Sequence, residues 1–202
     1  MLQGPTESAL IVRARGGDVA AFNELVAWYQ GQAFNLALRM LGSVPRPEDV
    51  TQDAFFAAFR HLASFKGPSF RNWLLRIVAN GCRDELRSDR RRPVDSLEQT
   101  LEVHPSAAPP DGAAGPAEVA ESRELARLLE AGLASLPEDQ RLVVVLADLQ
   151  GFDYEEIARI ARCPVGTVKS RLNRGRRRLR DYLRAQAELL PVRFRLPEEE
   201  GP

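Results

Sequence analysis

The sequence predicts an all-α protein of two small helical bundles, joined by a flexible linker, with a helix-turn-helix in the second bundle. Over most of the chain, apolar residues recur at steps of three and four, as on one face of an α-helix. A stretch rich in Pro, Ala, Gly and acidic residues interrupts this pattern at residues 93–121. Residues 154–179 are typical of two helices about a tight turn, because Cys163-Pro164 stops the first. A chain of 202 residues has room for two small domains.

The first bundle opens with two long helices. Asp18 can cap a helix whose apolar positions run through residues 22–40, and Gly42 ends that helix. Pro47 suits the first turn of the next helix, which we expect to run to about Ala63.

A third helix of this bundle carries basic and aromatic residues together. Ser69 is its expected cap, and its polar side includes Arg71, Arg76, Asn80, Arg83, Asp84 and Arg87. Cations can follow the phosphates of a single strand while aromatic planes stack on its bases. Phe70 and Trp73 suit a protein core equally well, so both interpretations stay open.

The remaining segments set the domain boundaries. The linker composition cannot bury enough apolar surface to order itself. It is either a simple tether or an acidic segment that lies in a basic channel of a partner. The boundaries that follow are 1–92 for the first bundle, 93–121 for the linker, 122–184 for the second bundle and 185–202 for a poorly ordered tail.

The last helix of the second bundle predicts DNA recognition. At about 100° per residue, Val168, Leu172, Gly175 and Leu179 share one arc, which should face the core. The opposite arc holds Gly166, Ser170, Asn173, Arg174 and Arg177, flanked by Lys169, Arg171, Arg176 and Arg178. Residues 159–180 contain nine Arg or Lys and no Asp or Glu, whereas a merely solvated face normally alternates in sign. The pattern favours a helix that enters the major groove.

Composition excludes several other classes of protein. The 28 basic and 28 acidic residues balance over the whole chain, so there is no net excess of charge. The charge is instead segregated locally, as in the basic residues 159–180. Two isolated cysteines and two histidines support neither a disulfide framework nor a metal site. No catalytic dyad, nucleophile arrangement or phosphate-binding glycine loop occurs, so we expect no enzyme activity and no cofactor. The chain lacks a signal peptide and a membrane span, which predicts a soluble cytoplasmic protein.

Four motifs in order resemble a known family. Residues 47–56, 70–77, 136–141 and 163–171 are similar to motifs of the extracytoplasmic-function (ECF) group of bacterial sigma factors. The similarity covers residues 22–92 for the family's first conserved region and 122–183 for its last. The resemblance implies a subunit that binds core RNA polymerase and directs it to promoter DNA. An anti-sigma factor is a further partner that it suggests.

The resemblance also implies sites. Core polymerase would bind Asp49, Gln52, Asp53 and Phe56, a face that by its pattern alone would more simply be solvated. The single-stranded minus-10 element would bind Lys66, Ser69, Phe70, Trp73, Arg76, Asn80 and Arg83. The double-stranded minus-35 element would be read by Thr167, Lys169, Ser170, Asn173, Arg174 and Arg177, with Arg171, Arg176 and Arg178 on the DNA backbone.

Three residues depart from the family pattern. Arg162 stands in the turn where the family usually has glycine, and Ala79 and Gly81 replace bulkier or basic residues of the minus-10 helix. Two other functions remain as alternatives. One is a helix-turn-helix repressor or activator that acts without being a polymerase subunit, and the other is an adaptor that occupies core polymerase without reading DNA.

Overall fold

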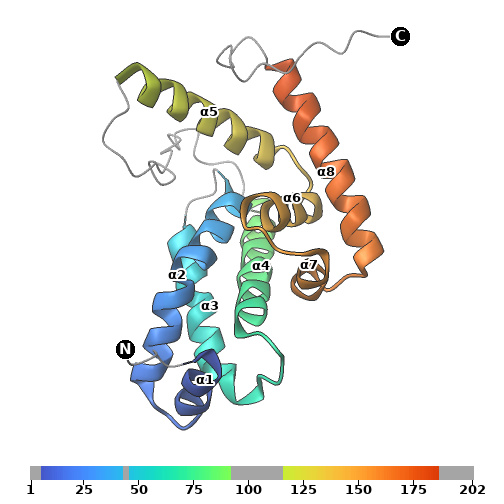
Figure 1. Ribbon diagram of the computed structural model, residues 1–202. Helices are drawn as coiled ribbons and strands as arrows, with labels where there is room; N and C mark the ends of the chain where they lie inside the picture. Colours follow the sequence, from blue (N-terminus) through green and yellow to red (C-terminus); the bar gives the residue numbers. More distant parts are fainter. Residues whose placement is uncertain (1–5, 43–45, 92–115, 187–202) are drawn as a thin grey trace.

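The computed structural model describes residues 6–42, 46–91 and 116–186, and these form helices and connecting turns without any strand (Figure 1). The all-α prediction is therefore confirmed. In chain order the elements are α1 (Glu7–Arg15), α2 (Val19–Leu41), α3 (Pro47–His61), the 3-10 turn η1 (Leu62–Ser64), α4 (Phe70–Asp89), α5 (Pro116–Ala134), α6 (Glu138–Val144), the π-helical turn η2 (Val145–Leu149), α7 (Tyr154–Ala161) and α8 (Val165–Ala185).

Local sequence signals place most helix ends. The Asp18 side chain accepts a hydrogen bond from the Ala21 amide, and Ser69 does the same for Asn72, so both predicted caps are confirmed. Gly42 ends α2 with a φ of 63°, which glycine adopts without steric cost.

Two helical segments extend beyond those that the pattern predicts. Helix α1 was not foreseen; it is capped by Thr6 and buries Leu10, Ile11 and Ala14. Helix α5 begins at Pro116, so residues 116–121, which we expected to belong to the linker, are helical. Proline is compatible with a first helical turn, and the alanines that follow favour a helix. Residues 93–115 of the expected linker and residues 187–202 of the expected tail lie outside the described part.

The first bundle consists of α1 to α4, with α2 and α3 packed against α4. Phe70 is completely buried and lies beside the rings of Phe22 and Phe65, with centroids 6.4 and 6.0 Å away. Gly81 allows α3 and α4 to approach, because a Cβ atom there would lie 3.1 Å from Cγ1 of Val50. This close approach explains the unusual glycine in the middle of α4.

The second bundle consists of α5 to α8, with α6 and η2 at its centre. Leu142, Val143, Val145 and Leu146 are completely buried and form the middle of this bundle. Helix α8 crosses α6 at Gly175, where an added Cβ would lie only 2.7 Å from Cγ2 of Val144.

The two bundles pack against each other, with α7 along α4 and α5 against α2 (Figure 1). The buried guanidinium of Arg141 donates to the carbonyl of Met40 at the end of α2. Burial lowers the pKa of Arg141 from its ordinary value. Arg39 and Glu130 form a second link, with 2.9 Å between guanidinium and carboxylate. The described bundles therefore share one continuous apolar core.

The turn of the helix-turn-helix rests on an arginine in an unusual conformation. Arg162 ends α7 with φ 53° and ψ 49°, the left-handed region that normally favours glycine. Its amide donates to the carbonyl of Ala158, as a glycine at this position would. The chain thus keeps the tight turn and bears the steric cost of a side chain there.

We expect Gly175→Ala to destabilise the protein by about 1–3 kcal/mol, because the new methyl group would overpack the crossing of α6 and α8. Thermal unfolding followed by circular dichroism measures the change. Gly31→Ala is the matched control, since Gly31 lies in α2 with no neighbour within 4 Å of an added Cβ. That control should be neutral or stabilising. Equal melting temperatures for the two variants would contradict the packing account.

We expect Arg162→Gly to be more stable than Arg162→Ala by about 0.5–1 kcal/mol. Both variants remove the guanidinium, but only glycine adopts a positive φ without steric cost. Urea unfolding of the two proteins makes the comparison. A more stable alanine variant would show that the turn carries no strain.

Candidate nucleic-acid interface

Helix α8 has the two faces that its sequence predicts. Val168, Leu172 and Gly175 are buried, and Leu179 packs at the edge of the core. On the opposite side, Ser170, Asn173, Arg174 and Arg177 are exposed, and so is Lys169 on the shoulder. Thr167, at the start of the helix, is half-buried. The exposed arc therefore presents short polar groups and long cations side by side.

The cations of α8 differ in what they contact. Arg171 pairs with Asp139 of α6 at 2.5 Å, and Arg176 pairs with Asp148 of η2 at 3.0 Å. The hydrogen bond that Arg176 donates to Asp148 raises the pKa of the guanidinium. Arg178 is exposed. Two of the three arginines expected to bind the DNA backbone are thus held by carboxylates of their own bundle.

The arc expected to read bases has no carboxylate partner within the described residues. Arg174 bonds only within its helix, from Nε to the carbonyl of Ser170 at 3.2 Å. Lys169 lies 5.8 Å above the ring of Tyr154. Neither contact neutralises the positive charge, so both side chains keep their full attraction for phosphate.

The aromatic residues of α4 belong mainly to the core. Phe70 has no exposed surface, so its ring cannot stack on a base in this conformation, and we assign it to packing. Trp73 is half-buried, with its ring 5.1 Å from that of Phe65. Ser69 is engaged as the cap of α4. Lys66, in the preceding loop, is exposed.

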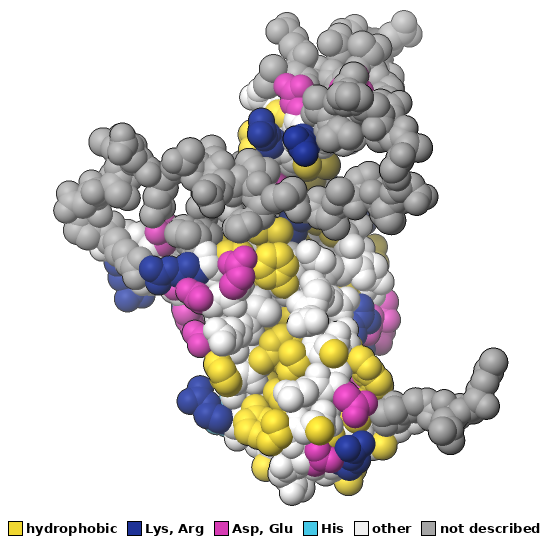
Figure 2. Space-filling view, turned by 90° about the vertical axis from the view of Figure 1, so that its left-hand side faces the viewer, with side chains coloured by type: hydrophobic (Ala, Val, Ile, Leu, Met, Phe, Trp, Pro, Cys, Tyr) yellow, Lys and Arg dark blue, Asp and Glu magenta, His cyan; other side chains and the backbone are white. Residues whose placement is uncertain are grey.

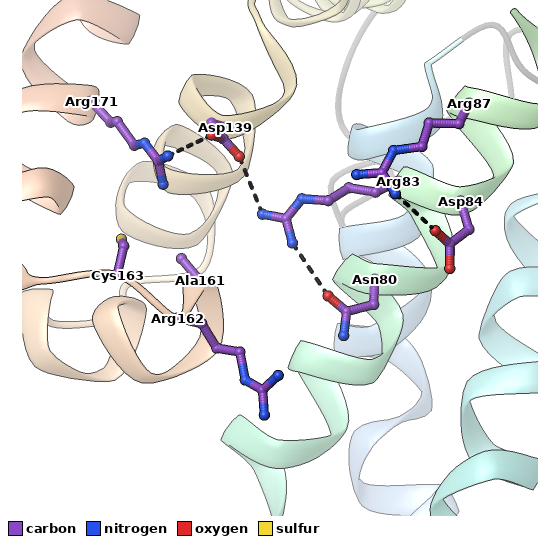
Figure 3. A pocket seen from close by; sticks show the side chains of 9 residues that line it. All are labelled: Asn80, Arg83, Asp84, Arg87, Asp139, Ala161, Arg162, Cys163 and Arg171. Carbon is purple, nitrogen blue, oxygen red and sulfur yellow. Dashed lines mark hydrogen bonds and ion pairs between the residues drawn. The ribbon is translucent and has the colours of Figure 1, made fainter.

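The polar face of α4 points toward the second bundle (Figure 3). Arg83 lies 3.4 Å from Asp139, and the Asn80 amide oxygen accepts from Arg83 at 3.4 Å. The pKa of Arg76 is lowered first by burial and then by the charge of Arg162. The structure therefore brings Arg76, Asn80 and Arg83 together, but it places them against α6, α7 and the turn after α7.

A polar cleft of about 480 Å³ remains between the two bundles at this point. Its lining residues, all drawn in Figure 3, are Asn80, Arg83, Asp84, Arg87, Asp139, Ala161, Arg162, Cys163 and Arg171. The sequence did not single out Asp139, because the helical pattern does not show which residues of separate bundles meet.

The predicted polymerase-binding residues all lie on the outside of α3. Asp49, Gln52 and Asp53 are exposed, and 57% of Phe56 is accessible to solvent. Asp49 makes only a loose ion pair with Arg46, at 3.8 Å. The four side chains are therefore free to meet a partner.

An apolar groove of about 750 Å³ runs beside these residues, between α2 and α3. Figure 2 shows hydrophobic side chains gathered on this side of the first bundle. Phe56 and Phe59 form one wall, and Val26 and Phe34 of α2 form the other. From the sequence alone we did not predict that α2 forms one wall of this groove. A signal was present, because Phe34 lies outside the apolar stripe that α2 needs for its core.

Two other kinds of site are not found in the described part of the chain. Within residues 6–42, 46–91 and 116–186, no cluster of His, Cys, Asp or Glu has the arrangement of a metal site. None of the helices described there is both long and apolar enough to cross a membrane.

Comparison with protein families identifies both bundles. The family model of sigma-70 region 2 matches residues 25–92, and that of sigma-70 region 4 matches residues 126–179. The ECF RNA polymerase sigma-E factor of Escherichia coli (strain K12) is 40% identical over 174 residues, which cover 85% of this chain and 91% of that protein. The protein of the same name from Haemophilus influenzae is 37% identical over 179 residues, covering 87% and 94%.

Two solved structures are also similar to this chain over most of its length. CnrH, in complex with the cytosolic domain of CnrY, is 31% identical, with a TM-score of 0.63 over 87% of this chain and 96% of CnrH. The sigma factor RpoE of Bartonella quintana, in complex with the anti-sigma factor NepR, is 25% identical, with a TM-score of 0.64 over 80% and 96%. Matches in both conserved regions and along most of the length lead to one conclusion: this chain belongs to the ECF family of RNA polymerase sigma factors.

Proposed function

We propose that this protein is a dissociable, non-catalytic subunit that binds core RNA polymerase in the cytoplasm and directs it to promoters. The observation that carries this proposal is the presence of two separate basic surfaces on one chain. The outward arc of α8 fits double-stranded DNA, whereas the basic face of α4 fits a single strand. A promoter presents both forms once its minus-10 element has opened.

The α8 surface supports recognition of the minus-35 element. Ser170 and Asn173 are short side chains that can reach base edges, and Arg174 can make the paired hydrogen bonds that distinguish guanine. Arg171, Arg176 and Arg178 flank this arc, where contacts to phosphate would set the position of the helix.

The α4 surface supports capture of the minus-10 strand. Arg76, Asn80 and Arg83 form a polar row, and exposed Lys66 lies near the start of the helix. These groups can hold phosphates and base edges, while half-buried Trp73 keeps some surface with which to contact a base. Full access to Arg76 and Arg83 requires the second bundle to move away from α4, because both side chains are partly buried in this conformation, whereas Asn80 is exposed.

The α3 face supports binding of core polymerase. Two carboxylates, Asp49 and Asp53, attract a basic surface, and the apolar groove beside them can bury helical side chains of a partner. Because RpoE was solved with the anti-sigma factor NepR, and CnrH with the cytosolic domain of CnrY, we also propose that an anti-sigma factor binds this chain.

We expect the double variant Lys169→Ala, Arg174→Ala to lose at least about tenfold of promoter-directed transcription, since each base or phosphate contact contributes about 1–3 kcal/mol. Run-off transcription with core enzyme measures this loss. Arg123→Ala, which removes one exposed cation from α5, should retain full activity.

Binding of core polymerase by the double variant should stay near wild type in the same preparation. Unchanged transcription would favour an adaptor that occupies polymerase without reading DNA. Tight operator binding by the free protein, with no transcript after core is added, would favour an independent regulator.

We expect Phe56→Ala to weaken binding to core polymerase about tenfold, because an exposed aromatic beside a groove is a typical anchor of an interface. Fluorescence anisotropy of labelled protein titrated with core measures the affinity. Trp28→Ala is the control: Trp28 is also an exposed aromatic, at 47%, but it does not line the groove. Equal losses in the two variants would argue against the α3 face.

A further inference from the structure

We infer that Asp139 is an internal competitor of DNA phosphate, which holds the two DNA-binding surfaces together when no promoter is bound. This inference rests on the proposed function. It assigns a role to a carboxylate of the cleft that is not itself among the residues proposed to bind DNA or polymerase.

Asp139 contacts one arginine from each DNA-binding surface (Figure 3). One carboxylate oxygen lies 3.4 Å from the guanidinium of Arg83 on α4, and the other lies 2.5 Å from that of Arg171 on α8. The side chains of both arginines are largely buried, with 17% and 23% exposed. The carboxylate therefore spans the cleft between the bundles and joins the two helices that are proposed to bind DNA.

The carboxylate of Asp139 contacts these arginines in the way that a DNA phosphate would. Guanidinium groups bind carboxylate and phosphate oxygens with the same charge-assisted hydrogen bonds. Arg83 is proposed to hold the minus-10 strand, and Arg171 to hold the backbone of the minus-35 duplex. Neither arginine can bind DNA fully while it is paired with Asp139.

Repulsion between cations of the two bundles opposes their contact at this edge of the interface. Arg76 of α4 and Arg162 of the turn are close enough for the charge of Arg162 to lower the pKa of Arg76. Asp139 supplies negative charge across this edge, between two groups of cations. Without Asp139, much less negative charge would offset the positive charges that meet at the cleft, which belong to Arg76, Arg83, Arg162 and Arg171.

Asp139 is one of several polar links between the bundles: Arg90 pairs with Glu138 at 3.0 Å, the Asn72 amide lies 3.5 Å from Glu156, and Gln150 donates to the carbonyl of Gln32. Arg141 donates to Met40 across the interface, but it also donates to Ala134 and Leu136 in its own bundle. Arg39 and Glu130 can exchange their ion pair for water at a small net cost. Arg141 therefore keeps acceptors in its own bundle when the bundles separate.

The test compares Asp139→Asn with Asp84→Asn in the full chain without polymerase. Both variants remove one negative charge from the lining of the same cleft, but Asp84 pairs with Arg87 of its own helix, at 3.4 Å. The probe is a fluorescent oligothymidylate of about 16 nucleotides, which reports access to a single-strand surface. Small-angle X-ray scattering measures the radius of gyration of each protein.

We expect Asp139→Asn to bind the oligonucleotide about three- to tenfold more tightly than Asp84→Asn, because loss of a partly buried ion pair shifts the equilibrium toward the open form by that order. Its radius of gyration should also increase, while that of Asp84→Asn should match the wild type. Asp139→Glu keeps the charge and should remain as compact as the wild type.

Equal affinities for the two asparagine variants, or an unchanged radius of gyration for Asp139→Asn, would overturn the inference. If Asp139→Asn loses its helical circular dichroism signal, Asp139→Ser replaces it in the same comparison. Run-off transcription by the wild type with core polymerase distinguishes failure of this inference from failure of the proposed function. Promoter-specific transcripts uphold the proposed function even when the inference about Asp139 fails.

Discussion

A run of nine cations without a single acid, in residues 159–180, is the constraint on which this structure depends. Such a segment folds stably only if its helices bury an apolar arc and if carboxylates elsewhere offset part of its charge. Val168, Leu172 and Gly175 supply the arc, and Asp139 and Asp148 supply the offset. The carboxylates pair with Arg171 and Arg176 on the flanks of α8 and leave its outward arc positive.

This distribution of charge connects the fold to its proposed role. The second bundle is built around α6, whose buried residues orient α8, while its first turn carries Asp139 toward α4. The same short helix thus positions α8, the proposed reader of the duplex, and contacts the surface proposed for the single strand. The α3 face lies on another side of the first bundle, so a partner can reach it while Asp139 still pairs with Arg83.

Much of the fold can be predicted from the sequence, because its signals are local. The caps at Asp18 and Ser69, the stop at Gly42 and the two faces of α8 follow from the spacing and chemistry of neighbouring residues. Helix α1 and the first turn of α5 were missed because their periodic stretches are short and lie beside segments of linker-like composition.

The contacts between the bundles could not be predicted in the same way. No local rule shows that Arg83 meets Asp139, or that the Arg141 guanidinium reaches the end of α2. Phe70 shows a related limit: sequence left it open between the core and DNA, and burial decides for the core. Conversely, Arg162 adopts the left-handed backbone conformation, so this turn keeps its geometry without the glycine that the family pattern leads one to expect.

The central claim is that this chain gives core RNA polymerase its choice of promoter. The most direct measurement adds the purified protein to core enzyme without any other sigma factor, transcribes genomic DNA and sequences the 5′ ends of the transcripts. The account predicts start sites that share two short upstream sequence elements at a constant spacing. Transcripts that do not depend on the added protein, or start sites without any common upstream sequence, would contradict it.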